Sequence, residues 1–238
     1  MTQRTWRRVL IGLSAAVLAL ALGRAFFVWR SRSAGETFVA HSTHLGAAAR
    51  EGAVLETVAR HTTALGLTRA AQLLDALDEA APGVRIGRAR LELYRGNCAA
   101  AADLLDDPGL PESPLVRELR SATRGCNLVM ASAPITEDRE AGLWVRTQDD
   151  EDRVLMADIV ATAAASRRVL QEALGIDWPD PIRVEVVRDR FSLSTISGLP
   201  VEAAETTGTV GIARFGRVML VSPRASKQGY PWLDTLAH

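Results

Sequence analysis

The pattern of hydrophobic and polar positions changes character twice along the chain. An unbroken apolar run near the N-terminus is followed, up to about residue 130, by alanine- and leucine-rich segments with helical spacing. The last hundred residues instead combine short alternating segments, typical of strands, with further helical segments. We therefore predict an α+β fold in three parts: an N-terminal hydrophobic helix within residues 1–34, a helical-repeat region over residues 35–132 and an α/β domain over residues 140–238.

The first part has the composition of an export or membrane-anchor signal. Residues 1–8 are polar and basic, and residues 9–23 are apolar, which is the size of a secretory signal peptide. Taken to residue 29, the apolar segment is long enough for a membrane-spanning helix, with Arg24 near one end. We expect an uncleaved anchor that contacts the membrane through residues 9–29. A cleaved signal and an ordinary buried helix are the alternatives.

Breaks in the helical pattern divide the second part into short helices. Pro82-Gly83 and Gly96-Asn97 interrupt the pattern, and Ser113-Pro114 is typical of an N-cap followed by proline in the first turn. The segment over residues 89–101, ARLELYRGNCAAA, resembles the helix–turn–helix of a tetratricopeptide repeat. This resemblance implies a helical scaffold that docks onto a protein partner or a neighbouring domain. A generic helical bundle without a partner is the alternative.

Cys98 and Cys126 are the two cysteines of the chain. A disulfide between them would close a loop and stabilise the fold by about 3 kcal/mol. Alternatively, each is a small buried apolar residue on a helix. Neither a Cys-x-x-Cys motif nor a Cys/His cluster is present, so a structural zinc site of the finger type is excluded.

In the third part, strands alternate with helices. The first expected elements are a strand over residues 143–147, a long helix ending at Gly175 and a strand over residues 182–187. A short helix over residues 191–196, closed by Gly198, follows. The last elements are a hairpin of strands 209–213 and 218–222 and a helix from Tyr230. The acidic run over residues 149–152 suits the solvated start of the long helix, where the helix dipole favours carboxylates. Metal binding by this run is the alternative.

This order of elements, with Ser222-Pro223-Arg224 and PWLDTLAH over residues 231–238, resembles the N-terminal half of the peptidase MA-like domain of gluzincin zinc metallopeptidases. In that family the helix after the hairpin carries His-Glu-x-x-His, in which the histidines bind zinc and the glutamate is the general base. His238 matches the first histidine. The resemblance implies that the domain continues beyond His238, that zinc belongs to the complete domain only, and that the given chain is inactive because one histidine cannot make a catalytic site.

Charge narrows the remaining classes of function. The chain has 28 basic and 28 acidic residues, but residues 1–34 hold six arginines and no acid, so the remainder is net acidic. Nucleic-acid binding needs a basic face, so we expect no nucleic-acid partner. Lys227 is the only lysine, which indicates the arginine-biased coding of a high-GC bacterium. His41 and His44 could share a helix face, but we expect a solvated surface there.

Two functions of different classes follow. We expect a fragment of a bacterial envelope zinc metallopeptidase-like protein, located at the inner membrane with its soluble part outside the cytoplasm. The alternative is a membrane-anchored helical-repeat adaptor without catalysis, whose α/β part is structural, because a fold alone does not determine chemistry.

Overall fold

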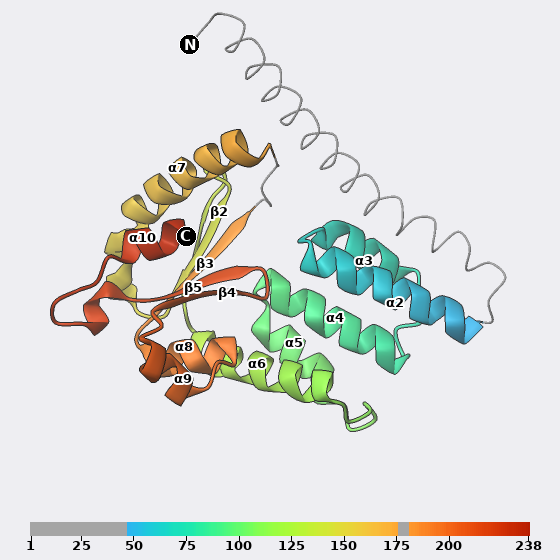
Figure 1. The fold of residues 1–238 in the computed structure, drawn as a ribbon. Helices are drawn as coiled ribbons and strands as arrows, with labels where there is room; N and C mark the ends of the chain where they lie inside the picture. The colour runs from blue at the N-terminus through green and yellow to red at the C-terminus, as the bar shows by residue number, and fades with distance from the viewer. Residues whose placement is uncertain (1–46, 176–180) are drawn as a thin grey trace, which may run out of the picture. The chain divides into compact units, whose positions relative to one another are not determined.

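The structure is a computed structural model that describes residues 47–175 and 181–238 (Figure 1). It divides into two compact units, Met1–Thr57 and Val58–His238, and helix α2 (Ala47–Thr63) contains the boundary. The fold class needs one correction. No helix within the described ranges is long and apolar enough to cross a membrane, and residues 9–29 lie outside those ranges, so an N-terminal hydrophobic helix is not supported.

Four short helices follow α2, and they begin or end near the predicted break points: Gly96-Asn97 lies between two helices, whereas Pro82-Gly83 and Ser113-Pro114 lie at helix starts. They are α3 (Leu67–Asp75), α4 (Pro82–Arg95), α5 (Cys98–Leu105) and α6 (Pro114–Met130), and each packs against the next. Gly96 ends α4 in the left-handed conformation, with φ of 87°, which glycine adopts without the steric penalty of a side chain. The Ser113 side chain accepts a hydrogen bond from the backbone N–H of Val116 and so caps α6, as predicted.

The α/β part contains one five-stranded mixed sheet. Its strands are β1 (Ile135–Asp138), β2 (Leu143–Thr147), β3 (Ile182–Val187), β4 (Gly211–Arg214) and β5 (Arg217–Val221), in the order β1-β2-β3-β5-β4. Strands β2, β3 and β5 are parallel, whereas β1 and β4 pair antiparallel at the two edges. The predicted bounds of β2 and β3 are confirmed, and so is the hairpin β4–β5. Strand β1 is an addition that the sequence pattern did not indicate.

Helices connect the strands and cover both faces of the sheet. They are the 3₁₀ helix η2 (Asp150–Leu155), α7 (Met156–Leu174), α8 (Arg190–Ser197), α9 (Val201–Thr207), the 3₁₀ helix η3 (Pro223–Ala225) and α10 (Trp232–Ala237). Gly175 and Gly198 end α7 and α8 in the left-handed conformation, as predicted. Helix α9 is a second element that the sequence pattern did not indicate.

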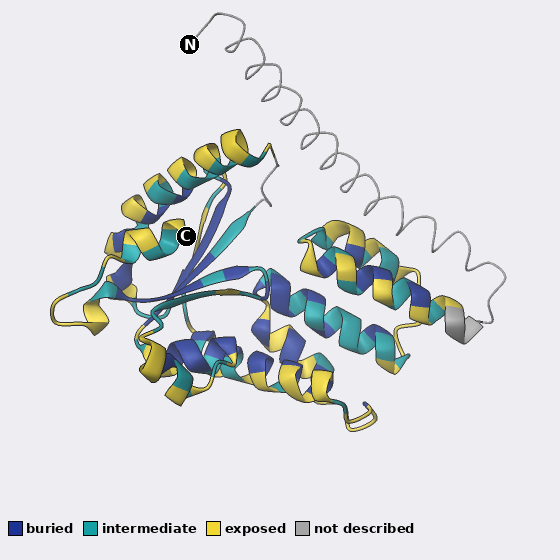
Figure 2. Ribbon diagram, viewed as in Figure 1, coloured by how far each residue is buried: buried dark blue, intermediate teal, exposed yellow. Residues whose placement is uncertain are grey.

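Two apolar clusters hold the sheet between its helical layers. On one face, Val187, Met219 and Val221 share a cluster with residues of α4, α5, α6 and α8. On the other face, side chains such as Val184 and Leu220 pack against α7 and α10. The parallel strands therefore lie in the interior, dark blue in Figure 2, with helices on either side. The first cluster joins the α4–α6 helices and the sheet into one hydrophobic core.

Candidate functional site

An apolar groove lies on the face of the sheet that α7 and α10 cover. Its volume is about 500 Å³, and its lining is contributed by α7, β3, β4, β5, α10 and the C-terminal residue His238. Side chains that line it include Leu170, Ile182, Val184, Val218 and Leu220. Pockets of this size with mostly apolar walls and a few polar groups at the rim are typical of sites that hold a side chain or a small ligand.

Close packing of α10 on the sheet positions this rim. A Cβ atom added to Gly211 would lie 2.6 Å from Cγ2 of Thr235, so glycine at this place in β4 lets α10 approach the strand. Trp232 and Leu236 pack against the apolar cluster on the same face. The Tyr230 hydroxyl, just before α10, donates to the backbone carbonyl of Val221, and burial raises the pKa of Tyr230 to about 12. Sequence and packing thus bring His238 to the edge of the groove.

His238, the histidine expected as a first zinc ligand, is not part of a complete metal centre among the described residues. Within residues 47–175 and 181–238, no group of three His, Cys, Asp or Glu side chains is arranged to hold a metal ion. His41 and His44 lie outside the described residues. Because a catalytic zinc ion needs three protein ligands, the described residues do not fit a complete zinc site, and His238 supplies at most one ligand.

The acidic run over residues 149–152 is only partly the solvated helix start that its composition suggested. Asp152 is fully buried and accepts hydrogen bonds from Oγ of Ser222, at 2.7 Å, and from Nε of Arg224, at 2.8 Å. Asp149 accepts a hydrogen bond from Nη2 of Arg188 at 2.6 Å, and this bond holds the pKa of Asp149 below its ordinary value. These two carboxylates form ion pairs that link the segments following the parallel strands.

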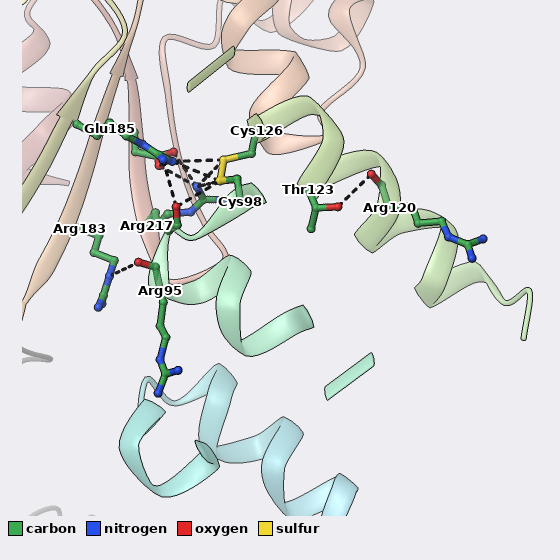
Figure 3. The surroundings of a disulfide bond; sticks show 10 residues. Arg95, Cys98, Arg120, Thr123, Cys126, Arg183, Glu185 and Arg217 are labelled. Carbon is green, nitrogen blue, oxygen red and sulfur yellow. Dashed lines mark hydrogen bonds and ion pairs between the residues drawn. A yellow bond between two sulfur atoms is a disulfide. The ribbon is translucent and has the colours of Figure 1, made fainter. Parts of the chain in front are cut away.

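A buried ionic cluster is a feature that the sequence analysis did not predict. Glu185 on the central strand β3 is fully buried and forms ion pairs with Arg146 of β2 and Arg217 of β5. Figure 3 shows Glu185 and Arg217 beside the disulfide. Nη1 of Arg217 donates to both carboxylate oxygens, at 2.8 and 2.9 Å, and Nη2 of Arg146 donates to Oε1. Burial alone would raise the pKa of Glu185, but the charges of Arg217 and Arg146 outweigh it and lower the pKa.

The ionic cluster contacts a disulfide. Cys98, the first residue of α5, is bonded to Cys126 of α6, and both are buried. Nη2 of Arg146 lies 3.4 Å from Sγ of Cys98 and 3.3 Å from Sγ of Cys126. Nη1 of Arg217 lies 3.2 Å from Sγ of Cys126. The two cysteines that the sequence offered as a pair are thus bonded in the structure, and they lie against two arginines from distant strands.

One signal in the sequence could have located this cluster. Interior parallel strands are buried on both faces, so charged residues that alternate along such a strand need buried partners of opposite charge. Arg146 and Glu185 each occupy the middle of a predicted strand, and they are register partners in the sheet.

Comparison with protein-family models, with curated proteins and with solved structures found no match to this chain.

Proposed function

We propose that residues 140–238 are the first half of a gluzincin-like zinc metallopeptidase domain, in which His238 is the first zinc ligand. The observation that carries the proposal is the path of the chain after the β4–β5 hairpin. It passes through η3 directly into α10, which packs on the sheet and brings His238 to the rim of the apolar groove. In the family that the sequence resembles, the helix after the hairpin is the one that carries His-Glu-x-x-His and so supplies the first two zinc ligands.

The groove supports the proposal by its chemistry. A peptidase needs a pocket beside its catalytic group that accepts part of the substrate. The groove beside His238 has mostly apolar walls, including Ile182 and Val218, and Arg167 also lines it. The 238 residues contain no His-Glu-x-x-His motif and no complete ligand set among the described residues, so we assign no hydrolytic step to them. Their proposed contribution is the first ligand and the adjoining pocket.

The first test is the nucleotide sequence of the gene across codon 238 and about thirty codons beyond. Glutamate directly after His238, with histidine three residues after that glutamate, is the expected result, because this spacing places both histidines on one helical face. A stop codon directly after His238 would exclude a catalytic metal site in this protein. That result would favour the alternative, a helical-repeat adaptor without catalysis.

The second test measures zinc by elemental analysis of the 238-residue chain and of the longer encoded chain, both purified without added metal. We expect no stoichiometric zinc in the shorter chain and about one zinc per longer chain, as a three-ligand site requires. His238→Ala in the longer chain should abolish zinc binding. His61→Ala, which changes a histidine of α2, is the matched control and should leave it intact. Zinc-free longer protein would refute the proposal.

A further inference from the structure

The buried cluster around the disulfide lacks one negative charge. Arg146 and Arg217 carry two positive charges, and Glu185 supplies one negative charge. All three side chains are at most 6% exposed, so solvent screens them little. Nε of Arg146 and both Nε and Nη2 of Arg217 have no hydrogen-bond partner within the described part of the chain. Buried charges are normally paired, so the excess positive charge needs an explanation.

The groups nearest to this excess charge that can become anionic are the two sulfur atoms. Both arginines place a guanidinium nitrogen close to the sulfur of Cys126, at 3.3 Å for Arg146 and 3.2 Å for Arg217. A disulfide sulfur is uncharged, but a thiolate at the same position would bring the net charge of the cluster to zero. Neighbouring cationic groups are what lowers the pKa of reactive cysteine thiols.

The charged groups farther from the sulfurs do not remove the excess positive charge that would stabilise a thiolate. Figure 3 also labels Arg95 of α4, Arg120 of α6 and Arg183 of β3 in the surroundings of the disulfide. Arg95 forms an ion pair with Glu92, and Arg120 forms one with Glu112. The pKa of Arg183 is lowered by its burial and, secondarily, by the charges of Arg95 and Arg217. Glu185 is thus the carboxylate paired with the two arginines that contact the sulfurs, and its charge is shared by both of them.

We propose that the Cys98–Cys126 disulfide is a redox-active site that is reduced by a dithiol, and that its reduced form keeps one negative charge on the sulfur of Cys126. Both cysteines are buried, and Cys98, at 4% exposed against 0% for Cys126, is the less completely buried of the two, so we assign the attack of the reductant thiolate to Cys98. The bond between the two protein sulfurs breaks, and Cys126 leaves as the thiolate beside Arg146 and Arg217. The second thiol of the reductant then displaces Cys98 from the mixed disulfide.

The balance of this reaction predicts its pH dependence. One reductant dithiol and one protein disulfide give the oxidised reductant, the Cys98 thiol, the Cys126 thiolate and one proton. Two electrons pass from the reductant to the protein. Because one proton is released, the equilibrium constant for reduction by the undissociated dithiol should rise about tenfold for each pH unit. If both cysteines were retained as thiols, no proton would be released and the constant would not change with pH.

The test titrates the full chain with mixtures of reduced and oxidised dithiothreitol between about pH 6 and 8, below the usual pKa of a thiol. Thiols are alkylated after equilibration, and the reduced fraction is read by mass. We expect the equilibrium constant to rise about a hundredfold over this range. A constant that does not vary with pH would overturn the proposal, and so would reduction that unfolds the chain, because exposed thiols stay protonated at these pH values.

Two variants of opposite charge effect separate the electrostatic role from a loss of packing. Glu185→Gln removes the negative charge and should favour the thiolate, so the equilibrium constant for reduction at pH 7 should rise at least tenfold. Arg217→Gln removes one positive charge, so the constant should fall at least tenfold and lose its pH dependence. Both changes disturb the same buried cluster. A shift of both variants in the same direction would show that packing, and not charge, sets the stability of the disulfide and would contradict the proposal.

Discussion

Helices α6 and α8 approach each other at Gly125, and this contact predicts the effect of adding a single methyl group. A Cβ atom placed on Gly125 would lie 2.2 Å from the backbone carbonyl oxygen of Thr195 and 3.1 Å from Cγ2 of the same residue. The nearer atom belongs to the backbone of α8, so no side-chain rotation can relieve the overlap. Gly125→Ala must therefore push the two helices apart.

The expected loss of stability follows from two opposing contributions. Alanine stabilises a helix interior by up to about 1 kcal/mol relative to glycine. Forcing an extra carbon into a packed interior typically costs about 1–3 kcal/mol. The overlap at Gly125 lies at the upper end of that range, because backbone atoms cannot yield as side chains do. We expect Gly125→Ala to lower the free energy of unfolding by about 1–2 kcal/mol, or the melting temperature by roughly 2–8 °C.

Urea denaturation followed by circular dichroism measures this change, with Gly52→Ala as the matched control. Gly52 lies in helix α2, and an added Cβ there would have no neighbour within 4 Å. The control should be neutral or stabilising by up to about 1 kcal/mol, since it carries only the helix-propensity contribution. A Gly125→Ala protein as stable as the parent would refute the inferred close contact between α6 and α8.

Two further predictions concern titration. The phenol of Tyr230 should ionise near its raised pKa of about 12, because burial favours the neutral form. The neutral, buried phenol contributes stability below its ordinary pKa of 10.0, and this stability is lost as the pH rises towards 12. Ultraviolet absorbance of the phenolate measures this, and Tyr230→Phe should remove that transition. The lowered pKa of Asp149, due to Arg188, contributes stability above the ordinary carboxyl pKa that is lost as the pH falls through the lowered value. Asp149→Asn should reduce the acid dependence of unfolding, and an unchanged dependence would contradict the ion pair.

The local sequence pattern was sufficient to predict the elements that end at a glycine or proline or that have a clear apolar pattern. Strand β3 alternates isoleucine and valine with charged residues, and the left-handed glycines Gly175 and Gly198 end their helices where the sequence predicts. Strand β1 was missed because its sequence, ITED, is polar and mostly exposed, and it is a strand only through its pairing with β2. Helix α9 ends in two threonines, which are poor helix formers, so its pattern is weak.

The ionic cluster, the disulfide and the groove depend on contacts between distant parts of the chain. The periodicity of apolar residues does not predict such contacts. Glu185 meets Arg146 from 39 residues away and Arg217 from 32 residues away. The pairing of Cys98 with Cys126 depends on the packing of α5 against α6, which the sequence pattern does not determine. The groove beside His238 combines side chains of α7, three strands and α10, so it exists only in the assembled fold.

The shared core of helices and sheet has a consequence for biosynthesis. Helices α4–α6 leave the ribosome before the sheet does, and Leu93 and Leu119 belong to the same cluster as Met219 and Val221, which are made about a hundred residues later. Until then the inner face of the helical layer has no sheet to cover it, and it is a surface on which a chaperone can act. Both cysteines also emerge before Glu185 and Arg217, so a disulfide formed during synthesis closes before the ionic cluster around it exists.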